Sequence, residues 1–107
     1  MHITFVKKIL TSGELCKKCQ EVSERLSSEE LIEIIDHISI ADERDIDSEG
    51  MRLAKKYSVE RAPFFLVEND QGEVEVFDIY FKFKKHMASL GLGKKNDKQL
   101  IDESKLI

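Results

Sequence analysis

Residues 2–19 read HITFVKKILTSGELCKKC, and this stretch decides the fold. Its first part is rich in β-branched and aromatic side chains, which predicts a buried strand over residues 2–10 built on Ile3, Phe5, Val6, Ile9 and Leu10. A break at Thr11-Ser12-Gly13 follows. Cys16 then begins a stretch in which Cys19, Val22 and Leu26 share one helical face. The sequence therefore predicts a strand that delivers two cysteines to the start of a helix.

The rest of the chain alternates between helices and strands. Ser27-Ser28-Glu29-Glu30 has the form of a capping box, which predicts that a short helical turn opens there. Patterns then predict a strand over 37–42, a helix capped by Asp47 or Ser48, a strand over 64–68, a turn at 69–72 and a strand over 73–79. A closing helix over 80–90 is stopped by Gly91 and Gly93.

This order, β-α-β-α-β-β-α, predicts one α/β domain over residues 1–93. Strands separated by helices pair in parallel, and two strands joined by a tight turn form an antiparallel hairpin. We therefore expect a mixed four-stranded sheet with helices on both faces. Residues 94–107 are polar and are predicted to be a tail, either mobile or folded as one short helix.

Size and composition limit the function. The 107 residues are 41% hydrophobic and 36% charged, which suits one small core under a densely charged surface. A net charge of -4 argues against a nucleic-acid partner. No apolar run approaches the length of a membrane span, and residues 1–10 lack the cleavage site of a signal peptide. We expect a cytoplasmic protein without a membrane partner.

Cys16 and Cys19 are the only cysteines of the chain. A disulfide between them closes a tiny loop and removes little entropy from the unfolded chain, so a structural staple explains them poorly. In a reducing compartment C-x-x-C indicates redox chemistry or half of a metal site. Three alternatives stay open. The cysteines could be two ordinary core residues, or they could bind a metal together with His2, His37 or His86, although none of these lies at ligand spacing. They could also hold an iron–sulfur cluster bridged between two chains.

The position of Cys16 favours an acidic thiol. Free N–H groups at a helix N-terminus stabilise a nearby anion, so a thiolate there is more stable than in a free cysteine. Lys17 and Lys18 add positive charge beside it, or are simply a solvated helix start.

Pro63, the only proline, directly precedes the strand over 64–68. Proline cannot donate a hydrogen bond to a neighbouring strand, so at this place it serves a positional purpose. One such purpose is a cis Ala62–Pro63 peptide that turns the backbone towards a neighbouring site; the alternative is a plain trans proline.

A C-x-x-C after the first strand, then about forty residues, then Lys56-Tyr57-x-Val59-x-x-x-Pro63 before a strand resembles the thioredoxin-like family from Met1 to about Leu90. The resemblance implies that fold, with Cys16 as exposed nucleophile and Cys19 as buried resolving thiol. It also implies that the cis-proline Pro63 faces the cysteines and that the backbone of Ala62 pairs with the bound partner.

The same resemblance implies a thiol–disulfide oxidoreductase that reduces a disulfide in a protein partner. Such a protein is re-reduced by an upstream reductase and needs no cofactor besides the Cys16–Cys19 pair. We expect a monomer, with Lys17 and Lys18 beside the bound partner.

Several positions depart from the family pattern. Lys17-Lys18 stand where thioredoxins usually carry glycine-proline, and Leu15 replaces the tryptophan before the motif. Leu10 falls where thioredoxins place a buried aspartate that relays a proton, so water or a group such as Glu14 has to replace it. No glycine-glycine-x-x-aspartate precedes the last helix, which argues against a glutathione site. The departures keep open a binding module for a client protein, a metal or an iron–sulfur cluster, with little redox activity.

Overall fold

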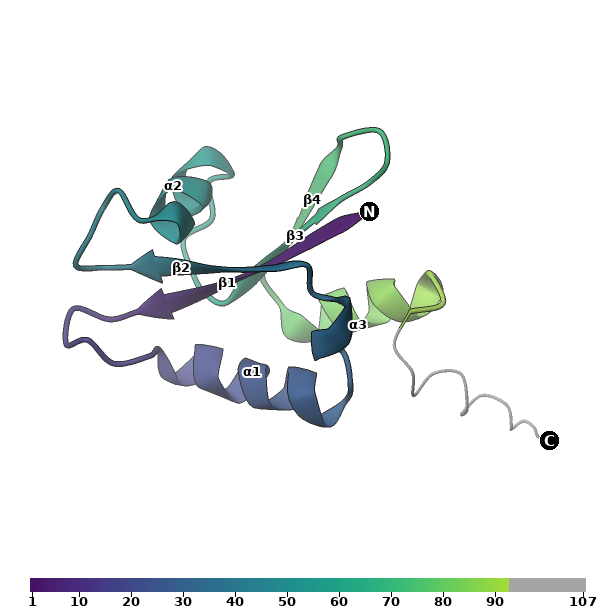
Figure 1. The fold of residues 1–107 in the computed structure, drawn as a ribbon, viewed down its shortest axis with the longest axis horizontal. Coiled ribbons are helices and arrows are strands. Elements are labelled where there is room, and N and C mark those ends of the chain that lie inside the picture. The colour runs from purple at the N-terminus through teal and green to yellow at the C-terminus, as the bar shows by residue number, and fades with distance from the viewer. Residues whose placement is uncertain (93–107) are drawn as a thin grey trace.

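A computed structural model describes residues 1–92, which form a four-stranded sheet with helices on both faces (Figure 1). The strands are β1 (His2–Ile9), β2 (His37–Asp42), β3 (Phe64–Glu68) and β4 (Val74–Phe77). The helices are α1 (Lys17–Ser28), α2 (Glu49–Lys56) and α3 (Tyr80–Ser89), with a short 3-10 turn η1 (Ile32–Ile34) after α1. The predicted element order is confirmed, whereas Gly93 and the predicted tail over 94–107 lie outside the described residues.

The strands lie in the order β2-β1-β3-β4. β1 pairs in parallel with β2, with Phe5 opposite Ile38, and antiparallel with β3, with Phe5 opposite Phe65. β3 and β4 form the predicted antiparallel hairpin. Because β1 lies inside the sheet and helices cover both of its faces, residues 3–6 are all buried, although strand side chains alternate between the two faces.

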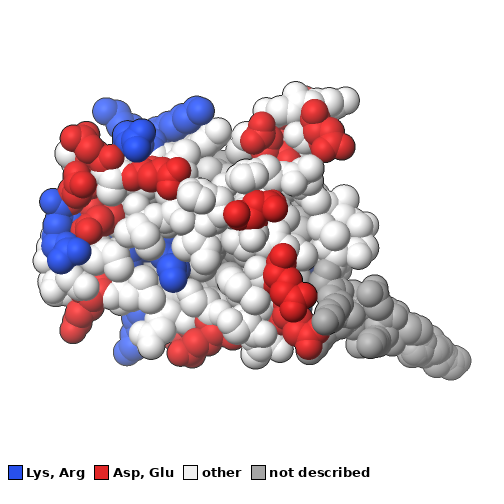
Figure 2. Space-filling view, in the orientation of Figure 1, with Lys and Arg blue, Asp and Glu red and all other residues white. Residues whose placement is uncertain are grey.

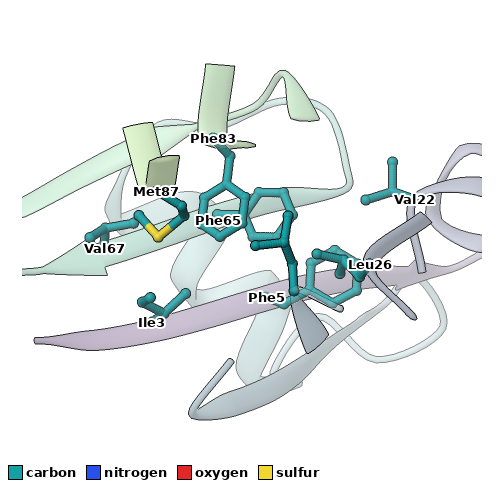
Figure 3. Packing of buried hydrophobic residues seen from close by; sticks show 9 residues of the cluster. Ile3, Phe5, Val22, Leu26, Phe65, Val67, Phe83 and Met87 are labelled. Atoms are coloured by element: carbon teal, nitrogen blue, oxygen red, sulfur yellow. The ribbon is translucent and has the colours of Figure 1, made fainter. Parts of the chain in front are cut away.

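The larger core lies between the sheet and the pair α1 and α3 (Figure 3). Its centre is aromatic: the ring of Phe65 stacks on Phe83 of α3 with centroids 3.8 Å apart and on Phe5 of β1 at 4.9 Å. Helix α1 contributes Val22 and Leu26. This core fixes α1, and therefore the cysteines at its start, against β1.

The opposite face of the sheet is covered by α2. Val6, Ala41, Phe64 and Leu66 form this second core under the helix. Gly50 allows the close approach, since a Cβ atom there would lie only 2.3 Å from the backbone nitrogen of Ala41. Glycine is required at this position for space, because only a residue without a side chain fits.

The prediction that a new helical turn opens at Ser27 is wrong. α1 continues through Ser28, and Glu29 and Glu30 end it, with Glu30 at a left-handed φ of 61°. The physical reason is burial: Leu26 extends the buried stripe of Cys19 and Val22 by one more turn, so packing keeps this segment helical.

The other predicted boundaries lie within a few residues of those in the structure. Ser48, rather than Asp47, is the N-cap residue of α2, and β4 is shorter than predicted at both ends. Gly91, with φ 78°, follows α3 as its predicted stop signal. None of the helices within residues 1–92 has the length and apolar character that crossing a membrane requires.

Candidate active site

The two cysteines lie where β1 turns into α1. Leu15 forms a bridge back to Ile9, and the backbone N–H of Cys16 donates to the carbonyl of Lys8 at 2.9 Å. These contacts hold Cys16 as the N-cap residue of α1. The predicted position at a helix start is confirmed, and both thiols are free in the structure.

Cys16 is half-buried and its thiol is acidified. Burial raises the pKa of this thiol, but three hydrogen bonds and one charge outweigh that effect and hold the pKa below its ordinary value. The hydrogen bonds come from the backbone N–H groups of Cys19 and Lys18 and from the Cys19 thiol, and the charge is that of Lys8. The first turn of α1 therefore stabilises the thiolate with its unpaired N–H groups.

Cys19 lies one turn further along α1 and is fully buried, with 0% of its surface exposed. Burial, together with the neighbouring Cys16, raises the pKa of its thiol to about 11. The backbone N–H of Lys8 donates to the Cys19 sulfur at 3.2 Å and acts in the opposite direction. The two thiols thus differ in both exposure and acidity.

Lys8 is the residue of this site that sequence reasoning missed. Its backbone contacts both cysteines, and its side-chain charge lowers the pKa of both thiols. The ammonium group pairs with Glu43 Oε2 at 3.4 Å. A lysine near the end of the predicted strand is the available signal in the sequence, but only the fold brings it to the helix start.

A second loop, between β2 and α2 over residues 43–48, supports the loop between β1 and α1 that leads to Cys16. The backbone N–H of Glu43 donates to the carbonyl of Ile9 at 2.9 Å, and Arg44 reaches over the β1–α1 loop, with Nη1 3.1 Å from where a Cβ atom of Gly13 would lie. Arg44 is itself fixed by two hydrogen bonds of 2.9 Å to Asp42, which lower the pKa of that carboxyl to about 2.

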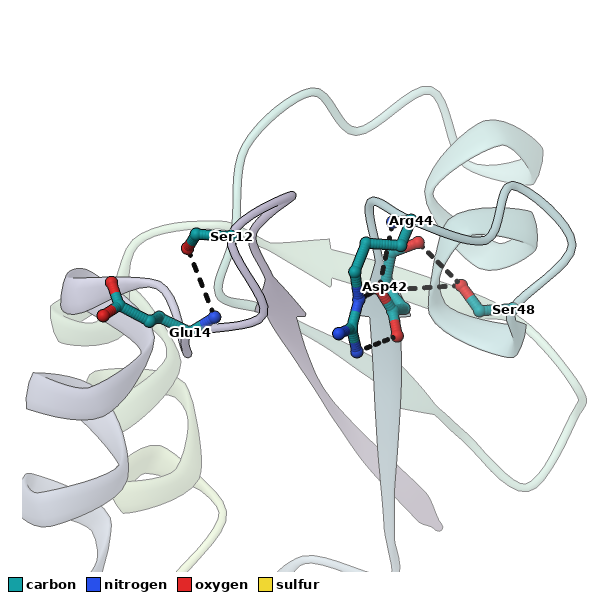
Figure 4. Close-up of polar contacts among 5 residues, drawn as sticks. All are labelled: Ser12, Glu14, Asp42, Arg44 and Ser48. Atoms are coloured by element: carbon teal, nitrogen blue, oxygen red, sulfur yellow. Dashed lines mark hydrogen bonds and ion pairs between the residues drawn. The ribbon is translucent and has the colours of Figure 1, made fainter.

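Glu14, the expected substitute for a proton-relay acid, is exposed in the β1–α1 loop. Its backbone N–H donates to Ser12 Oγ at 3.3 Å (Figure 4). The carboxylate of Glu43 instead pairs with Lys8, whose backbone contacts both cysteines.

Pro63 lies directly before β3, beside an open groove. The Ala62–Pro63 peptide bond is cis, as predicted, and Pro63 is buried. The groove has a volume of about 500 Å3, and its lining includes three of the predicted partner-binding residues, Lys18, Ala62 and Pro63. Lys17 is exposed and is not part of the lining, and neither are the two cysteines. Because Lys18 is part of it, the groove lies next to the C-x-x-C motif.

Within residues 1–92, no group of three or more His, Cys, Asp or Glu side chains is placed to hold a metal ion. His37 instead contacts Glu49 at 2.8 Å, and His86 stacks on Phe77 with ring centroids 5.0 Å apart.

Comparison with known proteins gives structural matches only. No protein-family model and no curated protein sequence matches the chain. A thioredoxin of Fasciola hepatica superposes with a TM-score of 0.51 at 20% identity, covering 82% of this chain and 80% of that one. A thioredoxin of Thermus thermophilus gives a TM-score of 0.45 at 22% identity, over 85% and 75% of the two chains. The mixed sheet, its helices on both faces and the Fasciola match together show that the chain has the thioredoxin-like fold.

Proposed function

We propose that this chain is a thiol–disulfide oxidoreductase that reduces a disulfide in a protein partner. The observation that carries the proposal is the asymmetry of the two thiols: Cys16 is partly exposed with a lowered pKa, and Cys19 is buried with a pKa of about 11. Attack on a disulfide needs an accessible thiolate. Release of the product needs a second thiol held nearby that does not compete for the first attack.

The proposed cycle transfers two electrons. The Cys16 thiolate attacks one sulfur of the partner disulfide, forming a mixed disulfide and releasing the other partner sulfur as a thiolate. Cys19 then loses its proton and attacks Cys16, which releases the second partner sulfur. The partner ends as a dithiol after taking up two protons, and the chain ends with a Cys16–Cys19 disulfide.

Lys8 supports both halves of this cycle. Its charge favours the Cys16 thiolate before attack and the Cys19 thiolate before release. The ion pair with Glu43 keeps that charge in a partly buried place, where it is screened less than on the surface. In this proposal Ala62, Pro63, Lys17 and Lys18 contact the partner.

We also propose an oligomeric state, a compartment and a source of electrons for this protein. It acts as a monomer in the reducing cytoplasm, where an upstream reductase returns the disulfide to the dithiol. The Cys16–Cys19 pair is the only redox group that the cycle requires.

The test uses the fact that the chain has two cysteines, so each single variant keeps one thiol. The reduced protein and the variants Cys16→Ser and Cys19→Ser are mixed with a cyclic disulfide peptide, quenched with acid and analysed by mass spectrometry. We expect wild type to yield the dithiol peptide, Cys19→Ser to accumulate a mixed disulfide at Cys16, and Cys16→Ser to do neither. Reduction of the peptide by Cys16→Ser at the wild-type rate contradicts the proposal.

A further inference from the structure

The groove beside Pro63 has a chemical character that the exchange reaction alone does not explain. Its apolar part comes from Val22 on α1 and from Ile79 and Phe81 at the start of α3. The side chain of Phe81 is 65% exposed, which is unusual for a phenylalanine and suits contact with another molecule.

Basic side chains surround this apolar part. Among residues 1–92, the lining contains four of them and a single acidic side chain, Asp78, although the whole chain carries a net charge of -4. The four are Lys18, Arg25, Arg61 and Lys84. The charge of the groove lining is therefore positive, opposite in sign to the net charge of the chain.

Neighbouring carboxylates neutralise these cations only in part. Arg61 pairs with Asp78 at 3.4 Å, and Lys18 lies 4.0 Å from Glu21. Lys84 and Arg25 share the single carboxylate of Glu29, at 3.2 and 3.3 Å. Four cations thus face three carboxylates.

Arg61 and Arg25 are also more exposed than the carboxylates with which they pair. The side chains of Arg61 and Arg25 are 72% and 58% exposed, whereas that of Glu29 is 23% exposed. Glu29 is held back by a further hydrogen bond from the hydroxyl of Tyr80. A molecule entering the groove therefore meets the guanidinium groups of Arg61 and Arg25 before it meets the carboxylates that pair with them.

Charged side chains are distributed unevenly over the face shown in Figure 2. On the face shown in Figure 2, Lys and Arg side chains appear, among acidic ones, only over the half where β1 and β2 end and α1 begins. The other half shows acidic side chains without basic neighbours.

Building on the proposed function, we propose that the groove selects protein disulfides that lie in acidic segments. Carboxylates of such a segment contact Arg61 and Lys84, an apolar residue covers Phe81, and the neighbouring disulfide is presented to Cys16 past the backbone of Ala62 and Pro63. Opposite charges raise the rate of encounter and fix the orientation of the partner. The exchange step itself remains the two-electron reaction described above.

The test compares three cyclic disulfide peptides of one scaffold, in which the cysteines are flanked by two Asp, two Asn or two Lys residues. Second-order rate constants for reduction by the reduced protein are measured in acid-quenched samples. We expect the Asp peptide to react roughly threefold to tenfold faster than the Asn peptide and the Lys peptide to react slowest. The preference shrinks at about 0.5 M salt, where charges on the surface are screened.

The double variant Arg61→Gln, Lys84→Gln is expected to bring the Asp:Asn rate ratio close to one. A matched control, Lys55→Gln with Lys56→Gln, removes the same charge from exposed sites on α2 and keeps the ratio of wild type. Equal rates for the three peptides, a ratio that the Arg61 and Lys84 changes leave intact, or faster reduction of glutathione disulfide than of the Asp peptide overturns the inference. Reduction of none of the peptides instead refutes the proposed function, and with it the selectivity.

Discussion

Replacing Gly50 by alanine tests the packing that places the second loop behind the cysteines. An alanine Cβ would lie 2.3, 2.4 and 2.6 Å from three backbone atoms of Ile40 and Ala41, where ordinary contact begins at 3.4 Å. The difference, 3.4 − 2.3, requires α2 to retreat from β2 by 1.1 Å. Backbone atoms cannot rotate away as a side chain can, so the helix itself has to move.

The cost follows from two opposing effects. Overpacking of this kind destabilises a fold by about 1–3 kcal/mol, and the upper end applies because the contacts are with backbone. Alanine recovers about 1 kcal/mol over glycine through its helix propensity. We expect Gly50→Ala to lose about 2 kcal/mol of unfolding free energy, which corresponds to a melting temperature lower by roughly 10 °C for a domain of this size.

Urea unfolding followed by circular dichroism measures this free energy, with the slope against urea unchanged. Gly72→Ala is the control, since that glycine has a φ of 82° and no atom within 4 Å of a Cβ. The Gly72→Ala variant measures how much unfolding free energy alanine costs through its backbone alone, where its Cβ atom meets no other atom. A Gly50→Ala protein as stable as wild type, or more stable, refutes the reasoning, because helix propensity would then dominate over a contact that the structure places at 2.3 Å.

Three further predictions concern the site and the core. Lys8→Met removes the charge that lowers the pKa of Cys16, so the pH midpoint for alkylation of this thiol by iodoacetamide moves upward; the neighbouring Lys7→Met is the control and leaves it in place. Phe83→Ala removes a ring stacked 3.8 Å from Phe65 and costs about 3–5 kcal/mol in urea unfolding, and a loss under 1 kcal/mol contradicts it. Burial of Cys19 as a neutral thiol stabilises the fold fully below pH 9 and less as the pH rises through about 11. Wild type therefore loses stability over this range relative to Cys19→Ala, and parallel pH profiles of the two proteins speak against a buried neutral thiol.

Some features of the fold follow from local patterns. β3 was predicted with its observed bounds because a run of four apolar residues, followed by Glu68, lies between a proline and a turn. The start of α1 at the C-x-x-C motif was predicted because the stripe of Cys19, Val22 and Leu26 begins there. The same buried stripe explains why the capping-box prediction failed. Burial of Leu26 keeps the chain helical through Ser28, and this outweighs the preference of Ser27-Ser28-Glu29-Glu30 for a new helix start.

The surroundings of the cysteines were beyond the reach of such patterns. Lys8 lies eight positions before Cys16 and meets it only because α1 folds back along β1. The groove combines residues 18–25, 61–63 and 78–84, which the sheet order and the stacking of α3 on Phe65 bring together.

The sequence by itself determined the order of the elements, the two thiols at a helix start and the proline before β3, because each depends on residues a few positions apart. Only the tertiary structure decided which lysine acts on the two thiols and how the groove is charged. Those properties depend on burial and on charges carried by separate elements, and such distances are set by packing across the whole sheet.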